Sequence, residues 1–531
     1  MAARARPLLA ILTIALVIVV SALARATVPA SAGGVGGGGV APTAWTPPDV
    51  LANFNHWPTG GYDLTNSRNA LYSTIMASNV SQLRQMWTFP LKGAGFFGDY
   101  STTPIVVGQT VYFQDTSSNV YALDRNTGHL IWEHKFNVLN IGPNGVTYGY
   151  GRIYGATETQ AFALDAATGR LLWTSRKLPR NNKEGIDDTP TVFNNTVIIS
   201  TVPGSGVQSF YAGNGMGIVY ALNAATGKVK WSFNTVKGGK LWGHWKINSG
   251  GGLWYPVAVD SQGRVFIGVA NPAPLQGTAQ YPNGSSHPGW NLYNDAVVAL
   301  NGNTGKLLWY HQVTHHDIRD YDCMIGPIVA DVPIGGTPTE IVMGACKSGQ
   351  VVGLKASDGA LIWQDAVGAH LNDTGPLPKA GAWVCPGELG GVETPMSYSN
   401  GVLYVPWLND CQYETPTAKT TKPAKTGGVP NGGGVTAINA ATGAKMWTRS
   451  FTGPTSMDFG ATTVSNDLVF TSTYNGRIYA LDRNNGAILW QAQAPAGING
   501  FPAIDGNLLI VGAGAPVSKT AKTAVIAYGL P

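Results

Sequence analysis

The chain repeats a short pattern in which apolar and polar positions alternate on either side of a tight turn. In the copy over residues 120–132, an alternating segment ends at Asp124, a turn with Gly128 follows, and a second segment ends at Trp132. Alternation with a period of two predicts a half-buried β-strand. The Asp and Gly of the turn predict a hairpin, because Asp bonds the turn backbone and Gly accepts positive φ. Each copy therefore predicts two paired strands.

The copies run through almost the whole chain, and each closes on a tryptophan. Full copies end at Trp132, Trp173, Trp231, Trp309, Trp363, Trp447 and Trp490, and a degenerate one ends at Trp87. A buried Trp covers about 150–250 Å², so one per repeat can join neighbouring sheets. A closed ring of four-stranded blades leaves few exposed sheet edges. The repeat predicts an all-β, eight-bladed β-propeller closed by the two ends of the chain, and disfavours a solenoid of two-stranded units.

The tryptophans are unevenly spaced along the chain. The longest segments lie between Trp231 and Trp309 and between Trp363 and Trp447. Loops inserted into a repeat scaffold are where binding residues usually lie. We therefore expect the functional residues of this protein mainly in these insertions.

Composition fits a β-propeller and argues against a nucleic-acid partner. Charged residues make up only 12% of the chain, with 69 Gly and 16 Trp, as many short strands and tight turns require. The net charge of +5 is spread thinly. The lysines of residues 415–426, with Lys519 and Lys522, lie in Thr-, Pro- and Ala-rich loops, so no basic face is predicted.

The N-terminus has the order of a secretory leader. Arg4 and Arg6 precede an apolar run over residues 7–24, and small residues follow at 24–26 and 30–32. This order predicts a leader over residues 1–32 and an exported, periplasmic or extracellular protein. The run is also long enough for an uncleaved membrane anchor. A Gly- and Pro-rich linker is predicted over 33–52 and the propeller over 53–531.

Export would place the four cysteines in an oxidising compartment, where two disulfides become possible in three pairings. We favour Cys323–Cys346, because the pair brackets a hairpin that turns near residues 335–336, and Cys385–Cys411, which closes a loop inside an insertion. The chain has no Cys-x-x-Cys-His sequence. A covalently attached haem is therefore excluded.

The repeated Ala-Leu-Asp-x-x-Thr-Gly-x-x-x-Trp motif resembles the tryptophan-docking motif of pyrroloquinoline-quinone (PQQ) dependent alcohol dehydrogenases, from about Asn53 to the C-terminus. The resemblance implies oxidation of a small or polymeric alcohol, with hydride passing to PQQ and electrons to a separate acceptor such as a cytochrome. Non-catalytic propellers, such as an outer-membrane assembly lipoprotein, share the repeat. A binding or envelope-assembly scaffold is therefore the alternative function.

Three residues match positions that contact PQQ in the family. Trp254, in Gly-Gly-Gly-Leu-Trp-Tyr-Pro, matches the flat floor under the quinone ring. Lys347, in Ala-Cys-Lys-Ser-Gly, matches a Lys or Arg that hydrogen-bonds the quinone oxygens, where it would stabilise negative charge. Glu393 stands where the family has an Asn. Taken singly, Trp254 could be one more core tryptophan and Lys347 a solvated hairpin lysine.

Three further residues match the family's metal site and catalytic base. Asn271, in Val-Ala-Asn-Pro-Ala-Pro, matches a metal ligand, Asp320 matches the base and a ligand, and Asp322 matches the extra carboxylate of the lanthanide-using branch. Carboxylates two residues apart in extended backbone face the same way and repel unless a cation lies between them. The resemblance thus implies a calcium or lanthanide ion. A polar surface turn and a rigid Asn-Pro loop are the alternatives.

Several family positions are not retained. Residues 203–217, where the family carries a metal-binding Glu, contain no carboxylate, and no two cysteines are adjacent to form the pair that covers PQQ. Asn144 replaces an Arg near the cofactor, and Arg319 replaces a Trp beside the base. We nevertheless expect the retained residues to converge on one face of the ring, near its axis.

Overall fold

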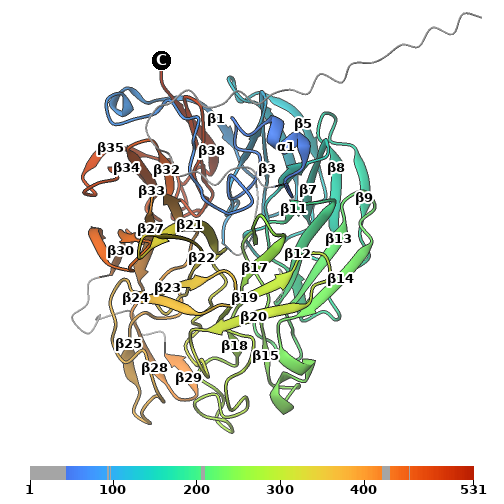
Figure 1. Cartoon of the computed structure of the whole chain (residues 1–531), viewed down its shortest axis with the longest axis vertical. Helices are drawn as coiled ribbons and strands as arrows, with labels where there is room; N and C mark the ends of the chain where they lie inside the picture. Colours follow the sequence, from blue (N-terminus) through green and yellow to red (C-terminus); the bar gives the residue numbers. More distant parts are fainter. Residues whose placement is uncertain (1–43, 93–94, 96, 205–209, 421–430, 454) are drawn as a thin grey trace, which may run out of the picture. The chain divides into compact units, whose positions relative to one another are not determined.

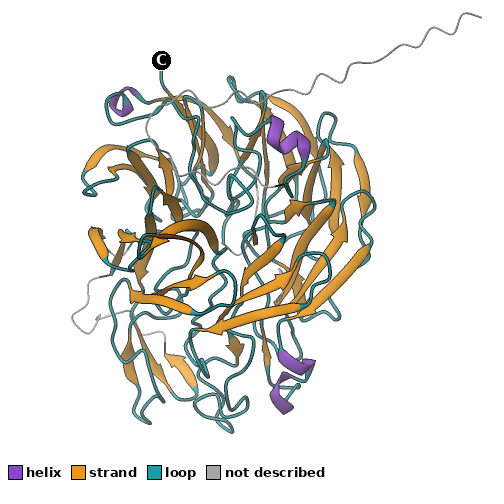
Figure 2. Cartoon of the chain, in the orientation of Figure 1, coloured by secondary structure: helices purple, strands orange, loops and turns teal. Residues whose placement is uncertain are grey.

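Eight of the antiparallel sheets follow one another around a ring (Figure 1). The computed structural model describes residues 44–531 except 93–94, 96, 205–209, 421–430 and 454. The leader predicted over 1–32 and the first part of the predicted linker lie outside the described residues. Figure 2 shows that strands make up nearly all of the regular structure. The predicted all-β, eight-bladed β-propeller is confirmed.

Blades 1 to 4 follow in sequence order. Blade 1 contains β2 (Ile105–Val107), β3 (Thr110–Gln114), β4 (Val120–Asp124) and β5 (Leu130–His134). Blade 2 contains β6 (Thr147–Gly149), β7 (Arg152–Ala156), β8 (Ala161–Asp165) and β9 (Leu171–Thr174). Blade 3 contains β11 (Thr191–Phe193), β12 (Thr196–Pro203), β13 (Ile218–Asn223) and β14 (Val229–Asn234), with β10 (Glu184–Ile186) also paired to β12. Blade 4 contains β16 (Ala258–Val259), β17 (Arg264–Gly268), β19 (Ala296–Asn301) and β20 (Leu307–Gln312).

Blades 5 to 8 complete the ring. Blade 5 contains β21 (Ile328–Ile334), β22 (Thr337–Ala345), β23 (Gln350–Lys355) and β24 (Leu361–Ala366). Blade 6 contains β26 (Ser397–Ser399), β27 (Val402–Asn409), β30 (Gly432–Asn439) and β31 (Lys445–Thr452). Blade 7 contains β32 (Thr463–Ser465), β33 (Leu468–Ser472), β34 (Arg477–Asp482) and β35 (Ile488–Gln493). Blade 8 contains β36 (Ala503–Asp505), β37 (Leu508–Ala513), β38 (Ala524–Gly529) and β1 (Arg84–Pro90).

Blade 8 joins the two ends of the folded chain. Its outer strand, β1, precedes all other blades in sequence and pairs antiparallel with the last strand, β38, with Trp87 opposite Ala527. The degenerate copy that ends at Trp87 thus supplies the strand that closes the ring, as the sequence predicted.

The repeat tryptophans join each blade to the next. The indole N–H of Trp231 donates to the carbonyl of Gly302 at 3.0 Å. Its ring lies against Gly305, where an added Cβ would come within 2.4 Å, and Gly305 has a φ of 69°. The same bond to the next blade is made by Trp87, Trp132, Trp173, Trp309, Trp363 and Trp447. The Gly of each repeat therefore meets both a turn requirement and a packing requirement.

The second part of the range expected to be linker packs against the blades. The indole N–H of Trp45 donates to the carbonyl of Ser261 at 3.0 Å. In the helix α1 (Pro48–Ala52), the Asp49 carboxylate accepts from the backbone N–H groups of Tyr150 and Gly151. These contacts tie residues 45–52 to blades 2 and 4.

The two longest insertions carry additional structure. Between Trp231 and Trp309 lie η2 (Lys237–Gly239), η3 (Leu241–Gly243) and the pair β15 (Ser249–Gly250) and β18 (Pro272–Ala273). Between Trp363 and Trp447 lie β25 (Ala382–Val384), β28 (Gln412–Thr415) and β29 (Ala418–Thr420). η1 (Val80–Gln82) precedes blade 8's outer strand. Among the helices the structure describes, none is long and apolar enough to cross a membrane.

Both predicted disulfides are confirmed: Cys323 is bonded to Cys346, and Cys385 to Cys411. The first pair brackets the β21–β22 hairpin, which turns at Gly335 and Gly336 as expected. The second closes a loop within the insertion that follows Trp363.

Candidate functional site

One buried lysine forms the centre of a charge cluster. The Nζ of Lys347 lies 2.7 Å from Asp322 Oδ2, 3.1 Å from Asp320 Oδ2 and 3.7 Å from Glu393 Oε2. It also lies 4.9 Å from the centre of the Trp254 ring. Lys347 is only 1% exposed. One ammonium therefore faces three carboxylates and an aromatic ring in a site shielded from water.

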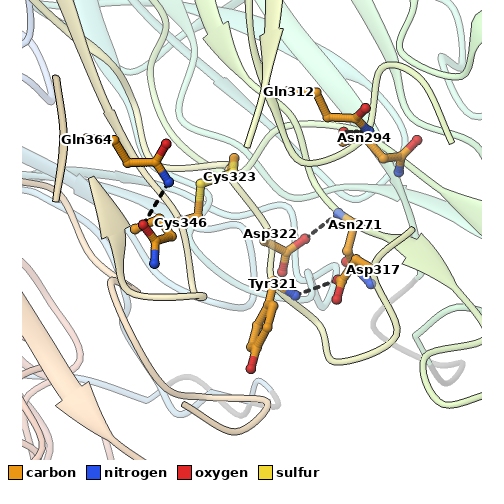
Figure 3. Close-up of a disulfide and its surroundings, with 10 residues drawn as sticks. Asn271, Asn294, Gln312, Asp317, Tyr321, Asp322, Cys323, Cys346 and Gln364 are labelled. Carbon is orange, nitrogen blue, oxygen red and sulfur yellow. Dashed lines mark hydrogen bonds between the residues drawn. A yellow bond between two sulfur atoms is a disulfide. The ribbon is translucent and has the colours of Figure 1, made fainter. Parts of the chain in front are cut away.

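A disulfide lies next to the ion pair of this cluster. Asp322 precedes Cys323, and Lys347 follows Cys346, so the bonded cysteines are the sequence neighbours of the two charged residues. The backbone N–H of Lys347 also donates to the carbonyl of Asp322 at 2.9 Å. Figure 3 shows the bridge beside Asp322. The two segments that carry the pair are thus joined covalently and by a backbone hydrogen bond.

Asn271 adds an unpaired oxygen to the site. Its backbone N–H donates to Asp322 Oδ1 at 2.7 Å (Figure 3), and its Nδ2 donates to the carbonyl of Pro272. Asn271 is fully buried, and its Oδ1 has no hydrogen-bond partner among the described residues. A buried acceptor without a donor is costly. This oxygen is therefore available to a ligand that offers positive charge or a hydrogen.

Asp320 is held at both carboxylate oxygens. Its Oδ1 accepts a hydrogen bond from the hydroxyl of Tyr211 at 2.8 Å, and its Oδ2 faces Lys347. Asp320 and Tyr211 have φ values of 69° and 64°. Such conformations cost a non-glycine residue about 1–3 kcal/mol and cluster at functional sites.

The pKa of each of three cluster members, Asp322, Glu393 and Lys347, is raised above its usual value. Burial, partly offset by Lys347, raises the pKa of Asp322 to about 6. Burial likewise raises the pKa of Glu393 to about 8. Burial alone would lower the pKa of Lys347, but the carboxylates of Asp320, Asp322 and Glu393 raise it well above its usual value. Lys347 thus remains an ammonium while Glu393 titrates near neutral pH.

A cavity of about 290 Å³ adjoins the cluster. Its walls are mostly apolar and aromatic, with Glu393 and a few other polar groups among Phe97, Ser101, Pro143, Trp254, Tyr255, Leu389, Thr394, Met457, Phe459, Tyr474 and Asn499. This volume is close to the lower end, about 300 Å³, of small-molecule sites. An apolar cavity with an indole in its wall suits a flat aromatic ligand.

A second, larger cavity of about 450 Å³ is lined by polar residues that include Arg319, Tyr321 and Ser348. Trp254 and Glu393 line only the smaller cavity. The smaller cavity is therefore the candidate cofactor site, although it is not the largest.

The donor set suits a hard cation. Three carboxylates outnumber the single ammonium of Lys347, and Asn271 adds a free amide oxygen, which are the ligand types of calcium. Within the described ranges, however, no three His, Cys, Asp or Glu side chains are spaced as a metal site. Lys347 lies between the carboxylates instead. The excess of carboxylates and the oxygen donors fit a cation. The unpaired Oδ1 of Asn271 would be its neutral ligand.

The positions that depart from the family pattern make local contacts. The Nδ2 of Asn144 donates to the carbonyl of Ile186. The Arg319 guanidinium donates to the backbone carbonyls of Asn372, Thr374 and Gly375. Among the described residues, the hydrogen bonds that the Asn144 and Arg319 side chains donate go to backbone carbonyls outside the Lys347 cluster.

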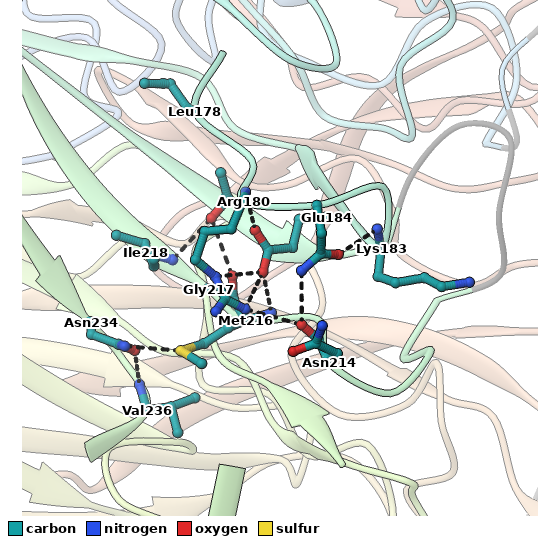
Figure 4. Close-up of polar contacts among 12 residues, drawn as sticks. Leu178, Arg180, Lys183, Glu184, Asn214, Met216, Gly217, Ile218, Asn234 and Val236 are labelled. Atoms are coloured by element: carbon teal, nitrogen blue, oxygen red, sulfur yellow. Dashed lines mark hydrogen bonds and ion pairs between the residues drawn. The ribbon is translucent and has the colours of Figure 1, made fainter. Parts of the chain in front are cut away.

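Tyr211 is the site residue that sequence reasoning missed. It lies in the stretch 203–217, which the sequence marked only by its lack of a carboxylate. The nearest glutamate upstream, Glu184, does not replace the missing ligand, because Arg180 and the backbone N–H of Met216 engage both of its oxygens (Figure 4). A tyrosine in a Gly-rich stretch carries no motif that would have signalled this contact.

The six residues singled out in the sequence lie in one network. Trp254, Lys347, Glu393, Asp320, Asp322 and Asn271 are linked by the contacts above, although they come from segments far apart in sequence. Their convergence was expected; their individual roles stay predictions.

Comparisons with known proteins give two family matches. A model described as "Glucose/ethanol/alcohol dehydrogenase, beta-propeller domain" matches residues 57–366. A second, "Outer membrane protein assembly factor BamB", matches residues 431–528. The first match covers more than half of the chain and includes Trp254, Asn271, Asp320 and Lys347.

Curated proteins of similar sequence are named as alcohol dehydrogenases. The quinohemoprotein alcohol dehydrogenase of Comamonas testosteroni is 26% identical over 85% of this chain and 71% of that protein. The quinoprotein alcohol dehydrogenase PedH of Pseudomonas putida is 24% identical over 84% and 83%.

The solved structure of the Comamonas enzyme aligns with a TM-score of 0.76 at 24% identity, covering 91% of this chain and 82% of that one. A europium-containing methanol dehydrogenase aligns with a TM-score of 0.77 at 21% identity, covering 91% and 100%. At these identities the structures establish the fold.

Proposed function

Since the chain belongs to the glucose/ethanol/alcohol dehydrogenase β-propeller family, we propose that it oxidises an alcohol with PQQ as the hydride acceptor. The observation that carries this proposal is the buried cluster of Lys347, Asp320, Asp322 and Glu393 beside Trp254 and an apolar cavity. The curated relatives are named as quinone-dependent alcohol dehydrogenases, which supports the same chemistry.

In this proposal, PQQ bound in the cavity supplies an electron-poor quinone that accepts a hydride. Trp254 would contact the flat face of the ring, and Glu393 would line its edge. The Lys347 ammonium would neutralise negative charge that develops on the quinone oxygens. Asp320 would take the proton of the substrate hydroxyl, because it is the carboxylate held between a hydroxyl donor and Lys347.

A calcium or lanthanide ion would be held by Asn271 Oδ1 with the carboxylates of Asp320 and Asp322. Charge balance supports this assignment, since buried carboxylates in excess of cations repel one another. The europium-containing methanol dehydrogenase among the similar folds is a protein that carries a lanthanide. Dye reduction with calcium compared with lanthanum identifies the ion.

Export and an external electron acceptor complete the proposal. The chain lacks a haem-attachment sequence, so electrons would pass to a separate protein such as a cytochrome. The leader over 1–32, followed by the propeller from residue 53, would place the enzyme in the periplasm or outside the cell. Contact with the membrane would be limited to an uncleaved N-terminal anchor.

A non-catalytic assembly or binding propeller is the second candidate, favoured by the assembly-factor match over residues 431–528. The charge cluster argues against it. Burying charges costs several kcal/mol each, and replacing a buried ion pair with apolar residues is often neutral or stabilising. A scaffold would gain nothing from the Lys347 cluster, whereas a redox site would use it.

The proposal is tested with purified protein and PQQ, alone and with calcium or lanthanum. We expect saturable quenching of tryptophan fluorescence and PQQ-dependent dye reduction with an alcohol. Trp254→Phe should reduce the quenching, whereas Trp407→Phe, a buried tryptophan that does not line the cavity, should leave it intact. Quenching without any dye reduction would favour the binding propeller, and no quenching under any condition would exclude PQQ.

A further inference from the structure

The larger of the two cavities described above has no part in the proposed reaction. Its volume of about 450 Å³ lies within the ~300–1,000 Å³ of small-molecule sites. It shares no lining residue with the smaller, apolar cavity beside Trp254. Its wall is mostly polar and comes mainly from residues 313–319, residues 373–376 and blade 5. The cavity is therefore a separate space with a different chemical character.

The wall contains a buried hydroxyl that has no partner. Ser348 lines the cavity and is 5% exposed. Among the described residues, no group forms a hydrogen bond with its Oγ. A buried polar group that stays unpaired is costly. A ligand that pairs with this hydroxyl would remove that cost.

A guanidinium in the same wall is fixed in place and only partly used. Arg319 lines the cavity, is as buried as Ser348, and donates through Nε and Nη2 to the carbonyls of Asn372, Thr374 and Gly375. A guanidinium has five N–H groups. The Nη1 of Arg319 forms no hydrogen bond with any described residue. Two well-positioned N–H groups are thus available to a ligand.

The charges of the wall favour a neutral ligand. The carboxylates in the wall belong to Asp317 and Asp373. Asp317 accepts from the backbone N–H groups of Arg319 and Tyr321, at 2.8 and 2.6 Å, and Asp373 pairs with His370 at 2.7 Å. Two carboxylates beside one guanidinium disfavour an anion. Since both carboxylates already have partners and Arg319 is positive, a cation is disfavoured as well.

An exposed aromatic pair adjoins the cavity. His315, which lines it, stacks on Trp290 with ring centres 4.2 Å apart and planes inclined by 11°. Trp290 is 57% exposed. Aromatic rings offer flat apolar faces, whereas the polar wall offers hydrogen bonds. A sugar ring matches both, because its hydroxyls point outward and its C–H groups cover its faces.

We propose that this cavity is a second ligand site, and that it binds a neutral sugar. A hydroxyl is both a donor and an acceptor, so one sugar can accept from Arg319 Nη1 and pair with Ser348 Oγ. Thr314, in the same wall, has a half-buried hydroxyl that bonds no described residue and adds a third contact. Binding here needs no PQQ, so the inference does not rest on the proposed function.

Calorimetric titration of the full protein without PQQ tests the site. The probes are glucose, maltose and cellobiose, and we expect saturable binding of at least one of them. Glucuronate and glucosamine keep the sugar ring but add a negative or a positive charge. Each should bind roughly tenfold or more weakly than the best neutral probe, a difference of about 1.4 kcal/mol.

Ser348→Ala locates the sugar in this cavity. Because the Ser348 hydroxyl has no partner in the free protein, the variant should be no less stable in urea, yet its affinity for the best probe should fall by roughly fivefold, as for one lost hydrogen bond. Thr314→Val should also weaken binding. Ser472→Ala is the matched control, since Ser472 has a buried, unpaired hydroxyl but lines neither cavity. Its affinity for sugar should equal that of the wild type.

The outcomes separate this site from the proposed function. If no neutral probe binds saturably, or if glucuronate or glucosamine binds more tightly than the neutral probes, the inference is overturned. Unchanged affinity in both Ser348→Ala and Thr314→Val would place the sugar elsewhere and overturns it equally. Sugar binding without any PQQ-dependent dye reduction would uphold the site while the proposed function fails.

Discussion

The Asp322 carboxylate and the Lys347 ammonium lie 2.7 Å apart, although Asp322 precedes the β21–β22 hairpin and Lys347 follows it. The backbone N–H of Lys347 also donates to the Asp322 carbonyl. This pair meets at the end of the β21–β22 hairpin, next to the bridge between Cys323 and Cys346. An ion pair, a backbone hydrogen bond and a disulfide therefore hold the two segments of the site together at the base of this hairpin.

Removing the Lys347 ammonium should destabilise the protein strongly. Lys347→Met would leave three buried carboxylates without a counter-charge, and breaking such a group typically costs about 3–5 kcal/mol. Urea unfolding measures the loss. Lys445→Met is the control, since the exposed pair of Lys445 with Asp365 should contribute only about 0–1 kcal/mol. Equal losses in the two variants would contradict the importance of the cluster.

Stability should fall with rising pH because of Glu393. Burial raises its pKa from 4.5 to about 8, so between these values the folded state binds more protons than the unfolded chain. By linkage, the free energy of unfolding then decreases as pH rises through this window. Glu393→Gln should flatten the curve between about pH 5 and pH 8, which urea unfolding at several pH values would reveal. Parallel curves for variant and wild type would rule out the raised pKa.

The two disulfides should differ in function. Losing either one should cost about 2–5 kcal/mol of stability. The paired variant Cys323→Ser/Cys346→Ser should also weaken PQQ and cation binding by roughly tenfold, about 1.4 kcal/mol, because the bridge fixes the segments that carry Asp322 and Lys347. Cys385→Ser/Cys411→Ser serves as the control. Binding is measured by fluorescence at a temperature where all variants are folded, and equal affinities would contradict the expectation.

The turn glycines that pack against a repeat tryptophan should tolerate substitution less well than other turn glycines. At Gly305, an added Cβ would lie 2.4 Å from the Trp231 ring, whereas at Gly335 it would meet open space. Both have positive φ, so Gly305→Ala and Gly335→Ala share a backbone cost of about 1–2 kcal/mol. Gly305→Ala should lose a further ~1–3 kcal/mol from overpacking. Urea unfolding of the two variants provides the comparison, and equal losses would mean that the indole moves away freely.

The fold could be predicted because each repeat carries its own packing contact. The Trp of one copy packs against the Gly of the next copy, as Trp231 does against Gly305. A pattern within each copy therefore predicts how neighbouring blades pack. The disulfide between Cys323 and Cys346 was predictable for a similar reason, since one hairpin brings both cysteines together. Periodic and hairpin-linked features are thus visible in sequence.

The candidate site was only partly predictable. Family resemblance marked Lys347 as a cofactor contact, but its pairing with three carboxylates depends on tertiary packing. Tyr211 gave no signal, because its contact with the site is one hydroxyl that reaches Asp320 from a loop distant in sequence. The aromatic wall at Phe97 was equally hidden. Such contacts arise from where loops cross, which a single sequence does not encode as a pattern.

The pairing of β1 with β38 sets an order of assembly. β1 has no partner in the ring before β38 forms, so the ring stays open until residues 524–529 are available. A chain that stops short of them would present two bare sheet margins, those of β37 and β1, and bare margins recruit other chains. Ring closure and solubility are thereby coupled: molecules that contain residues 524–529 pair both margins, whereas molecules that lack them are prone to aggregation.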